Sequence, residues 1–193
     1  MIKNKKKTSY NINQVIENEK GWLFYDTNLK LRRILHNLLK GSKILDLGCG
    51  SALSISISKI FNPNLKIEGF EEQESVRPIW KKRGAKVTTG KINKLPFENN
   101  SFDTVYSSHV LEHLKDPNKA ILESIRVSKK RVIHIVPEGN VNEKNFGTPH
   151  LKVYNRKNFL SLFKKYNLKI IKYESVQDTH MNSLIICLEK NEN

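Results

Sequence analysis

The stretch KILDLGCGSA, Lys43 to Ala52, decides the fold of this 193-residue chain. An apolar run typical of a buried strand leads into Asp46, and Gly48 and Gly50 follow before a helical pattern begins at Ala52. Glycines let a ligand approach the backbone closely, and the first turn of a helix presents free N–H groups. This turn therefore predicts a site for a nucleotide-like ligand at the carboxyl end of a strand.

Beyond Lys43, short apolar runs alternate with helical patterns, which is typical of βαβ units and a mostly parallel sheet. The strands Lys169–Glu174 and Ser183–Leu188 are joined by a polar link too short for a parallel crossover, so they predict an antiparallel hairpin. The predicted fold is α/β: a Rossmann-like, seven-stranded, mostly parallel sheet with an antiparallel terminal hairpin and helices on both faces. The other predicted strands are Lys43–Leu47, Leu65–Phe70, Lys86–Thr89, Phe102–Ser107 and Arg131–Val136, and the predicted helices are Tyr10–Glu19, 21–41, Ala52–Phe61, Glu72–Arg83, Pro117–Ser128 and Arg156–Tyr166.

Length and composition favour one globular domain, with 38% hydrophobic residues. Within it, we expect residues 1–41 to form a basic tail and leading helices, and residues 42–193 to form the ligand-binding domain. No apolar run reaches the roughly 20 residues that cross a bilayer, and no secretory signal is visible, so we expect a cytoplasmic protein without membrane contact. Cys49 and Cys187 predict neither a disulfide nor a metal site.

The net charge of +15 has two interpretations. A clustered basic face would bind a polyanion in a salt-dependent way. The lysines, however, are spread over almost every segment and arginine is scarce, which favours a general compositional bias. Nucleic acid is therefore a less favoured partner than a small molecule, and the sequence predicts no oligomeric state.

Two further strand ends carry residues suited to a ligand. The segment EGFE places Glu71 about twenty residues beyond Gly50, where an acid accepts the ribose hydroxyls of an adenosine. Ser107 and His109 follow the strand Phe102–Ser107. Because parallel strands end at the same edge of a sheet, we expect these residues to lie near the glycine turn.

Together, ILDLGCGSA, EGFE and LPFENNSFDTVYSSHVLEHL closely resemble the class I S-adenosylmethionine-dependent methyltransferases, and within them the methyltransferase-11-like domain. The resemblance implies S-adenosylmethionine as cofactor and S-adenosylhomocysteine as product. It implies that Gly48 and Gly50 pass close to the methionine part, that Asp46 orders the turn and the amino group, and that Glu71 holds the ribose. The expected cofactor-binding residues are Asp46, Gly48, Cys49, Gly50, Glu71, Glu72, Lys91, Ile92, Ser107, His109, Trp22 and Tyr25.

One position departs from the family pattern. Where members often carry an acid and a small residue after the third strand, this chain has Lys91 and Ile92. The backbone N–H of Ile92 remains a donor for adenine, whereas the Lys91 ammonium cannot accept from the exocyclic amine.

Methyl transfer from a sulfonium needs in-line positioning and, for oxygen or nitrogen acceptors, a general base. The candidates are His109, His113 and His150, each of which also has a purely structural interpretation. His36 and His134 are expected to be structural. The loop Pro137–Pro149 lies after the fifth predicted strand and is the expected substrate-facing segment.

Three functions stay open from the sequence. The first is methyl transfer to an O, N or C centre of a small metabolite. The second is an RNA or protein methyltransferase, which the positive net charge favours. The third is a non-catalytic S-adenosylmethionine-binding module or a nicotinamide-binding protein on the same fold, because fold alone does not fix function.

Overall fold

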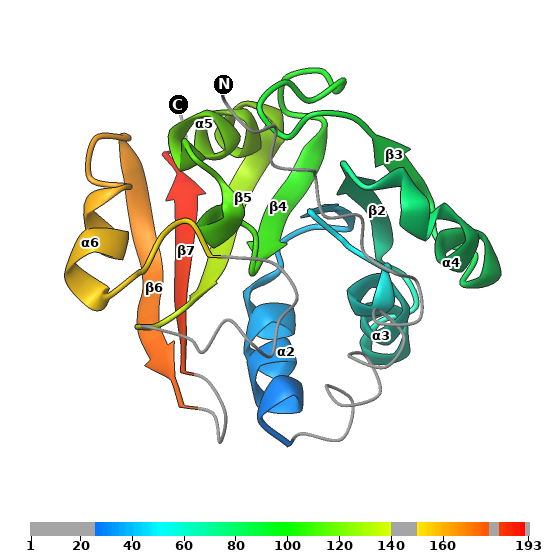
Figure 1. Ribbon diagram of the computed structural model, residues 1–193, viewed down its shortest axis with the longest axis horizontal. Coiled ribbons are helices and arrows are strands. Elements are labelled where there is room, and N and C mark those ends of the chain that lie inside the picture. Colours follow the sequence, from blue (N-terminus) through cyan, green and yellow to red (C-terminus); the bar gives the residue numbers. More distant parts are fainter. Residues whose placement is uncertain (1–25, 140–149, 178–181, 192–193) are drawn as a thin grey trace, which may run out of the picture.

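The computed structural model describes residues 26–139, 150–177 and 182–191. These residues form one seven-stranded sheet with helices packed against it (Figure 1). In chain order the elements are α2 (Asp26–Leu38), β1 (Lys43–Leu47), α3 (Leu53–Phe61), β2 (Lys66–Glu71), η1 (Glu74–Val76), α4 (Arg77–Lys82), β3 (Val87–Thr89), β4 (Phe102–Ser108), η2 (Leu111–His113), α5 (Pro117–Val127), β5 (Ser128–Pro137), α6 (Arg156–Ser161), β6 (Leu168–Val176) and β7 (Ser183–Lys190).

The strand order of the sheet is β3-β2-β1-β4-β5-β7-β6. Strand β1 pairs in parallel with β2 on one side and β4 on the other, so the carboxyl ends of these three strands meet at one edge. Strand β7 pairs antiparallel with both β5 and β6. The predicted parallel sheet and its antiparallel terminal hairpin are both confirmed.

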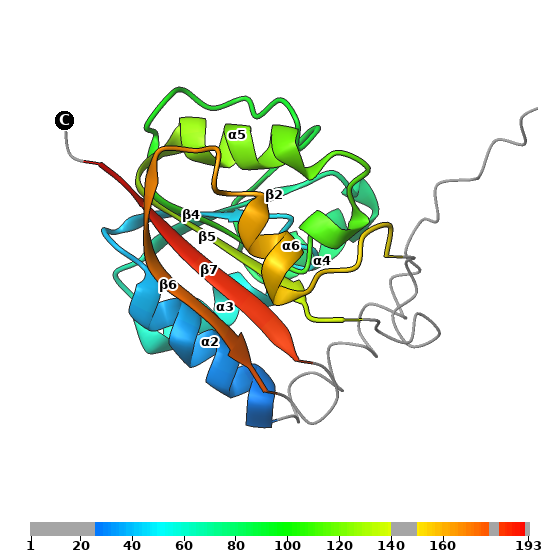
Figure 2. The ribbon, with the colours of Figure 1, turned by 90° about the vertical axis from the view of Figure 1, so that its left-hand side faces the viewer.

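Two apolar clusters cover the two faces of the sheet. On one face Leu35 of α2, Ile55 of α3 and Trp80 of α4 pack against inward-facing residues of the strands. On the other face Ile121 of α5 and Phe159 of α6 do the same. Figure 2 shows the sheet between α2 and α3 on one side and α5 and α6 on the other, which confirms helices on both faces.

The helix that follows β2 begins later than the pattern predicted. The side chain of Glu71 accepts the backbone N–H of Gln73, and the side chain of Glu72 accepts the backbone N–H of Ile92, so neither residue joins a helix. A 3-10 turn follows, and α4 begins at Arg77 with Pro78 at its start, where proline is tolerated.

The helix α6 is also shorter than expected, because it ends at Ser161 rather than at Tyr166. The next backbone N–H groups, those of Leu162 and Phe163, donate to carbonyls three residues earlier, which is the tighter pattern of a 3-10 turn. Strand β5, in contrast, starts three residues earlier than predicted and runs from Ser128 to Pro137.

Several expectations lie outside the described residues. They are the helix Tyr10–Glu19, the aromatic residues Trp22 and Tyr25, and most of the loop Pro137–Pro149. Within the described part of the chain, no helix combines the length and the apolar character that a bilayer span requires.

Candidate functional site

The glycine turn lies directly over the end of the neighbouring strand. The backbone N–H groups of Gly48 and Cys49 both donate to the carbonyl of Phe70 in β2, at 2.7 and 3.1 Å. Gly48 has φ +79°, and a Cβ there would lie 2.4 Å from Val110 Cγ2. The turn therefore requires glycine at this position, and it packs against the segment that leads into η2.

Glu71 joins the turn to the end of β2. Its Oε2 accepts the backbone N–H of Gly50 at 2.8 Å, and its Oε1 accepts that of Gln73 at 2.9 Å. Burial raises the pKa of this carboxyl above its ordinary value, and the backbone donors partly offset that effect. The predicted meeting of Gly50 and Glu71 at one edge is thus present, and each carboxylate oxygen keeps a lone pair for a second hydrogen bond.

Gly50 lines an open space. It has φ +53°, and a Cβ built there would meet no atom within 4 Å. Two residues fix the backbone around it: Trp80 Nε1 donates to the Gly50 carbonyl at 2.6 Å, and Arg83 Nη1 donates to the Ser51 carbonyl at 2.7 Å. Neither contact was predicted, because Trp80 in α4 and Arg83, the residue after α4, lie 30 and 32 positions further along the chain than their partners.

Asp46 is buried beneath the turn, and its Oδ2 has no hydrogen-bond partner among the described residues. Burial raises the pKa of this carboxyl to about 7, against the lowering effect of a hydrogen bond from Tyr106. The hydroxyl of Tyr106 also bonds to Ser54 Oγ at 3.0 Å. A cationic ligand group at this end of β1 would find an acceptor that nothing else in the described structure satisfies.

A pocket of about 280 Å³ lies beside the ends of β2 and β3. The residues that line it include Glu72, Lys91, Ile92, Leu114 and Asp116. The backbone N–H of Ile92 donates to Glu72 Oε1 at 2.7 Å, so a ligand that used this donor would have to displace or share that carboxylate. Three of the expected cofactor residues therefore do come together.

Two expected cofactor residues turn their side chains into the core. Ser107 is fully buried, and its hydroxyl shares a hydrogen bond of 2.7 Å with His134 Nδ1. The thiol of Cys49 packs against Gly69, and burial raises its pKa. Neither side chain is placed to contact a ligand at the strand ends, whereas the backbone of Cys49 forms part of the turn.

Of the three histidines expected at the site, His109 and His113 follow β4, and His150 precedes α6. His109 follows β4 with φ +56°, its backbone N–H donates to the Ile135 carbonyl, and its Nε2 lies 3.3 Å from Ser183 Oγ. His113 and His150 lie together, with ring centroids 4.9 Å apart. His134, as expected, is structural: it is fully buried, and burial lowers the pKa of its imidazole to about 3.

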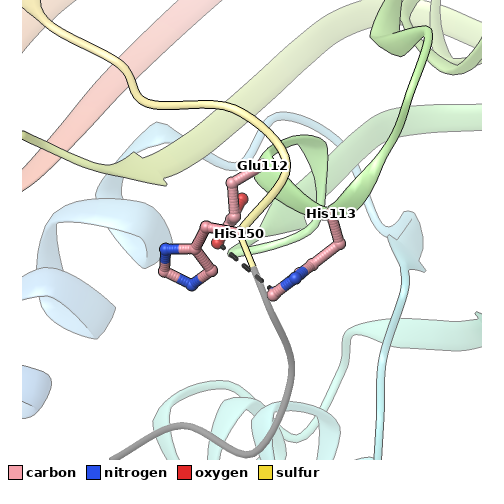
Figure 3. Close-up of side chains that lie close together, drawn as sticks. All are labelled: Glu112, His113 and His150. Carbon is pink, nitrogen blue, oxygen red and sulfur yellow. Dashed lines mark ion pairs between the residues drawn. The ribbon is translucent and has the colours of Figure 1, made fainter. Parts of the chain in front are cut away.

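Glu112 adjoins the paired histidines, and no functional role was predicted for it. Its side chain is fully buried, and Oε1 lies 3.8 Å from His113 Nε2. Burial raises the pKa of this carboxyl to about 8. Figure 3 shows the Glu112 carboxylate between the imidazoles of His113 and His150.

The residues at this edge fit S-adenosylmethionine. The open space at Gly50 admits a ligand close to the backbone, the unsatisfied Asp46 oxygen suits an ammonium group, and Glu71 has lone pairs for ribose hydroxyls. Residues 45–136 match the family model described as a methyltransferase domain. The chain carries a methyltransferase domain. Its seven-stranded sheet has the fold that solved SAM-dependent methyltransferases share.

Comparison with curated proteins extends over part of the methyltransferase domain. The demethylmenaquinone methyltransferase of Staphylococcus aureus is 34% identical over 96 residues, which cover 47% of this chain and 40% of the relative. An uncharacterised 37.1 kDa protein in transposon TN4556 of Streptomyces fradiae is 27% identical over 119 residues, which cover 58% of this chain and 34% of the relative. The chain thus spans well under half the length of these relatives.

The fold comparison extends over nearly the whole chain. A SAM-dependent methyltransferase from Thermotoga maritima superposes with a TM-score of 0.73 at 19% identity, over 93% of this chain and 98% of the other. Because the sequence identity is only 19%, this similarity shows a shared fold and nothing finer.

Proposed function

We propose that this chain transfers the methyl group of S-adenosylmethionine to an O, N or C centre of a small molecule. The observation that carries the proposal is the bond from the Gly50 N–H to Glu71 beside an open space that a Cβ would not fill. A turn of this kind holds an adenosine-containing ligand against the strand ends. The name of the demethylmenaquinone methyltransferase relative supports a small-molecule acceptor.

When bound, S-adenosylmethionine would supply an electrophilic methyl group: an electron pair of the acceptor would form the new bond to the methyl carbon, the carbon–sulfur bond would break, and S-adenosylhomocysteine would leave as a neutral thioether. The protein's part is to bind and to orient. Glu71 would accept the ribose hydroxyls, and the ionised Asp46 would accept the ammonium group. Ile92 and the pocket between Glu72 and Leu114 would take the adenine.

An acceptor oxygen or nitrogen must also lose a proton, and a histidine at this edge would take it. His109 directly follows β4, His113 is the last residue of η2, and His150 lies further along the chain. Val110, the residue just before η2, packs against Gly48 of the turn. All three histidines therefore belong to segments that adjoin the strand ends where the methyl group would be presented.

The proposal is tested with the purified chain and S-adenosylmethionine labelled with tritium in the methyl group. The chain is incubated separately with a metabolite fraction of a cell extract, with total RNA and with extract protein. We expect label in the metabolite fraction, and we expect Glu71→Ala to abolish it. Binding of S-adenosylhomocysteine without any transfer would indicate a non-catalytic binding module instead.

A second candidate, an RNA methyltransferase, is favoured by one observation. Lys91, Lys115 and Lys119 all line the pocket beside β3, where they would raise the local concentration of a polyanion. Glu72 and Asp116 line the same pocket and offset part of that charge. Label in RNA, with retention on heparin that persists at high salt, would favour this candidate over a small-molecule acceptor.

A further inference from the structure

The cluster of Glu112, His113 and His150 has the composition of a transition-metal site. One ligand atom from each side chain lies within 4.8 Å of the other two. Two imidazoles and one carboxylate form a donor set that binds Zn²⁺ in catalytic sites and Fe²⁺ in oxygenases. Figure 3 shows both imidazoles flanking the carboxylate.

Glu112 supplies an independent reason to expect a ligand. The residue is fully buried, and neither of its carboxylate oxygens has a hydrogen-bond partner in the described part of the chain. A buried carboxylate is costly unless a cation or hydrogen-bond donors compensate it. Glu112 Oε1 lies 3.8 Å from His113 Nε2, which is longer than a hydrogen bond.

The backbone holds the members of the cluster in place. The carbonyl of Glu112 accepts the N–H groups of both Leu151 and Lys152, at 2.8 and 3.0 Å. These two bonds tie the segment that carries His150 to η2, which carries the other two members. Tyr154 adds a bond from its hydroxyl to the Leu111 carbonyl at 3.4 Å. These hydrogen bonds thus hold the backbone that carries all three side chains, although His150 is distant from His113 in the sequence.

The distances suit a metal ion after a small adjustment. Two donors about 2.1 Å from one tetrahedral ion lie about 3.4 Å apart. The separation of 3.8 Å between Glu112 Oε1 and His113 Nε2 is close to this value. The third donor is a ring nitrogen of His150, and the three donor atoms lie within 4.8 Å of one another. A side-chain rotation that moves this nitrogen on the order of 1 Å would bring it within bonding distance of the same ion.

We propose that Glu112, His113 and His150 bind a divalent d-block cation, Zn²⁺ in the first instance, beside the methyl-transfer edge. Three protein ligands leave coordination positions open, as in catalytic zinc sites. Val110 packs on Gly48, so the ion would lie near the glycine turn, where an acceptor oxygen could coordinate it and lose its proton to water. With the ion bound, His113 and His150 would act as ligands and not as general bases. This role of the ion rests on the proposed function, whereas the binding itself does not. Magnesium and calcium, which prefer oxygen ligands, are not expected to bind.

The experiment uses the untagged full chain after treatment with a chelator. Zn²⁺ is titrated by calorimetry, and Co²⁺ is followed by its visible ligand-field absorption, which intensifies when the ion leaves six water ligands for a site of lower coordination. We expect one equivalent of each ion to bind and Mg²⁺ not to compete. Glu112→Gln and His150→Gln should each weaken binding by at least about tenfold, because even residues behind the ligands contribute about 10–100-fold.

Matched controls are His36→Gln and Glu98→Gln, which lie outside the cluster and should bind the ion as the unaltered chain does. Because Glu112 is buried, thermal unfolding checks each variant, and His113→Gln offers a second test if Glu112→Gln does not fold. Failure of the unaltered chain to bind Zn²⁺ or Co²⁺, or equal binding by folded cluster variants, would overturn the proposal. Measuring S-adenosylhomocysteine binding in the same samples separates the two proposals. Cofactor binding without metal binding would rule out only the proposed metal site. Metal binding without cofactor binding would rule out only the proposed methyl transfer.

Discussion

Gly50 donates its backbone N–H to Oε2 of Glu71 at 2.8 Å, which ties the glycine turn after β1 to the end of β2. The other oxygen of Glu71 accepts the Gln73 N–H, so one carboxylate fixes two loops. Each carboxylate oxygen can accept more than one hydrogen bond. Ribose hydroxyls could therefore bind to Glu71 without releasing the turn, and the site is organised before the ligand arrives.

Replacing Glu71 by Ala removes both the expected ribose acceptor and the support of the turn. We expect the affinity for S-adenosylhomocysteine to fall by at least about 10-fold, since a hydrogen bond to a charged group contributes roughly 1.5–3 kcal/mol. Calorimetry measures the loss. Glu74→Ala is the matched control, because the Glu74 side chain forms an exposed ion pair with Arg77, and its loss should leave the affinity unchanged. Equal affinity in both variants would remove Glu71 from the site.

Two glycines of the turn should respond differently to alanine. Gly48→Ala combines a positive φ with a Cβ 2.4 Å from Val110, so we expect it to lower the free energy of unfolding by more than about 2 kcal/mol. Gly50→Ala meets no atom and should lose only about 1–2 kcal/mol from its positive φ. Urea unfolding compares the two variants.

The Gly50→Ala variant also tests the ligand's position. Its methyl group would project into the space that the cofactor is expected to fill, so we expect weaker binding of S-adenosylhomocysteine in a protein that remains folded. If calorimetry finds the affinity of the unaltered chain, the ligand does not pass beside Gly50.

Asp46 should make cofactor binding depend on pH. Burial raises the pKa of this carboxyl to about 7, so it is largely neutral below that pH and ionised above it. The ammonium group of S-adenosylmethionine favours the ionised form, so the affinity should rise as the pH increases through about 7. Near and below that pH, binding should release a proton, which calorimetry detects by comparing buffers of different ionisation enthalpy. Asp46→Asn should lose this proton release, and its persistence would assign the proton to another group.

His134 should destabilise the fold in acid. Its imidazole is fully buried, and burial lowers its pKa from 6.5 to about 3. As the pH falls below 6.5, His134 binds a proton in the unfolded chain but stays neutral in the folded chain. Its contribution to stability is therefore full above pH 6.5 and is lost progressively as the pH falls toward about 3. Urea unfolding at several pH values in this window should show a shallower slope for His134→Gln than for the unaltered chain, and identical slopes would contradict the assignment.

The sequence predicted the features that depend on local pattern. The alternation of apolar runs and helical patterns gave the parallel strands, and the short link before Ser183 gave the antiparallel hairpin. The glycine spacing gave the turn, and the distance to Glu71 gave its partner at the strand edge. These features need only nearby residues and the rules of strand connection.

Features that depend on contacts between distant residues were missed. Glu72 was assigned to a helix, whereas its side chain binds the Ile92 N–H twenty positions away. Ser107 was expected at the ligand edge, whereas its hydroxyl hydrogen-bonds to His134 on the adjacent strand and lies in the core. The contacts of Trp80 and Glu112 depend on the tertiary fold. No local pattern shows that α4 packs over the glycine turn or that His150 lies beside η2.

Calorimetric titration of the untagged chain with S-adenosylhomocysteine tests the central claim most directly. The account predicts binding of one equivalent, weakened by Glu71→Ala and by Gly50→Ala and unchanged by Glu74→Ala. Absence of binding at millimolar ligand by a chain that unfolds cooperatively would contradict it.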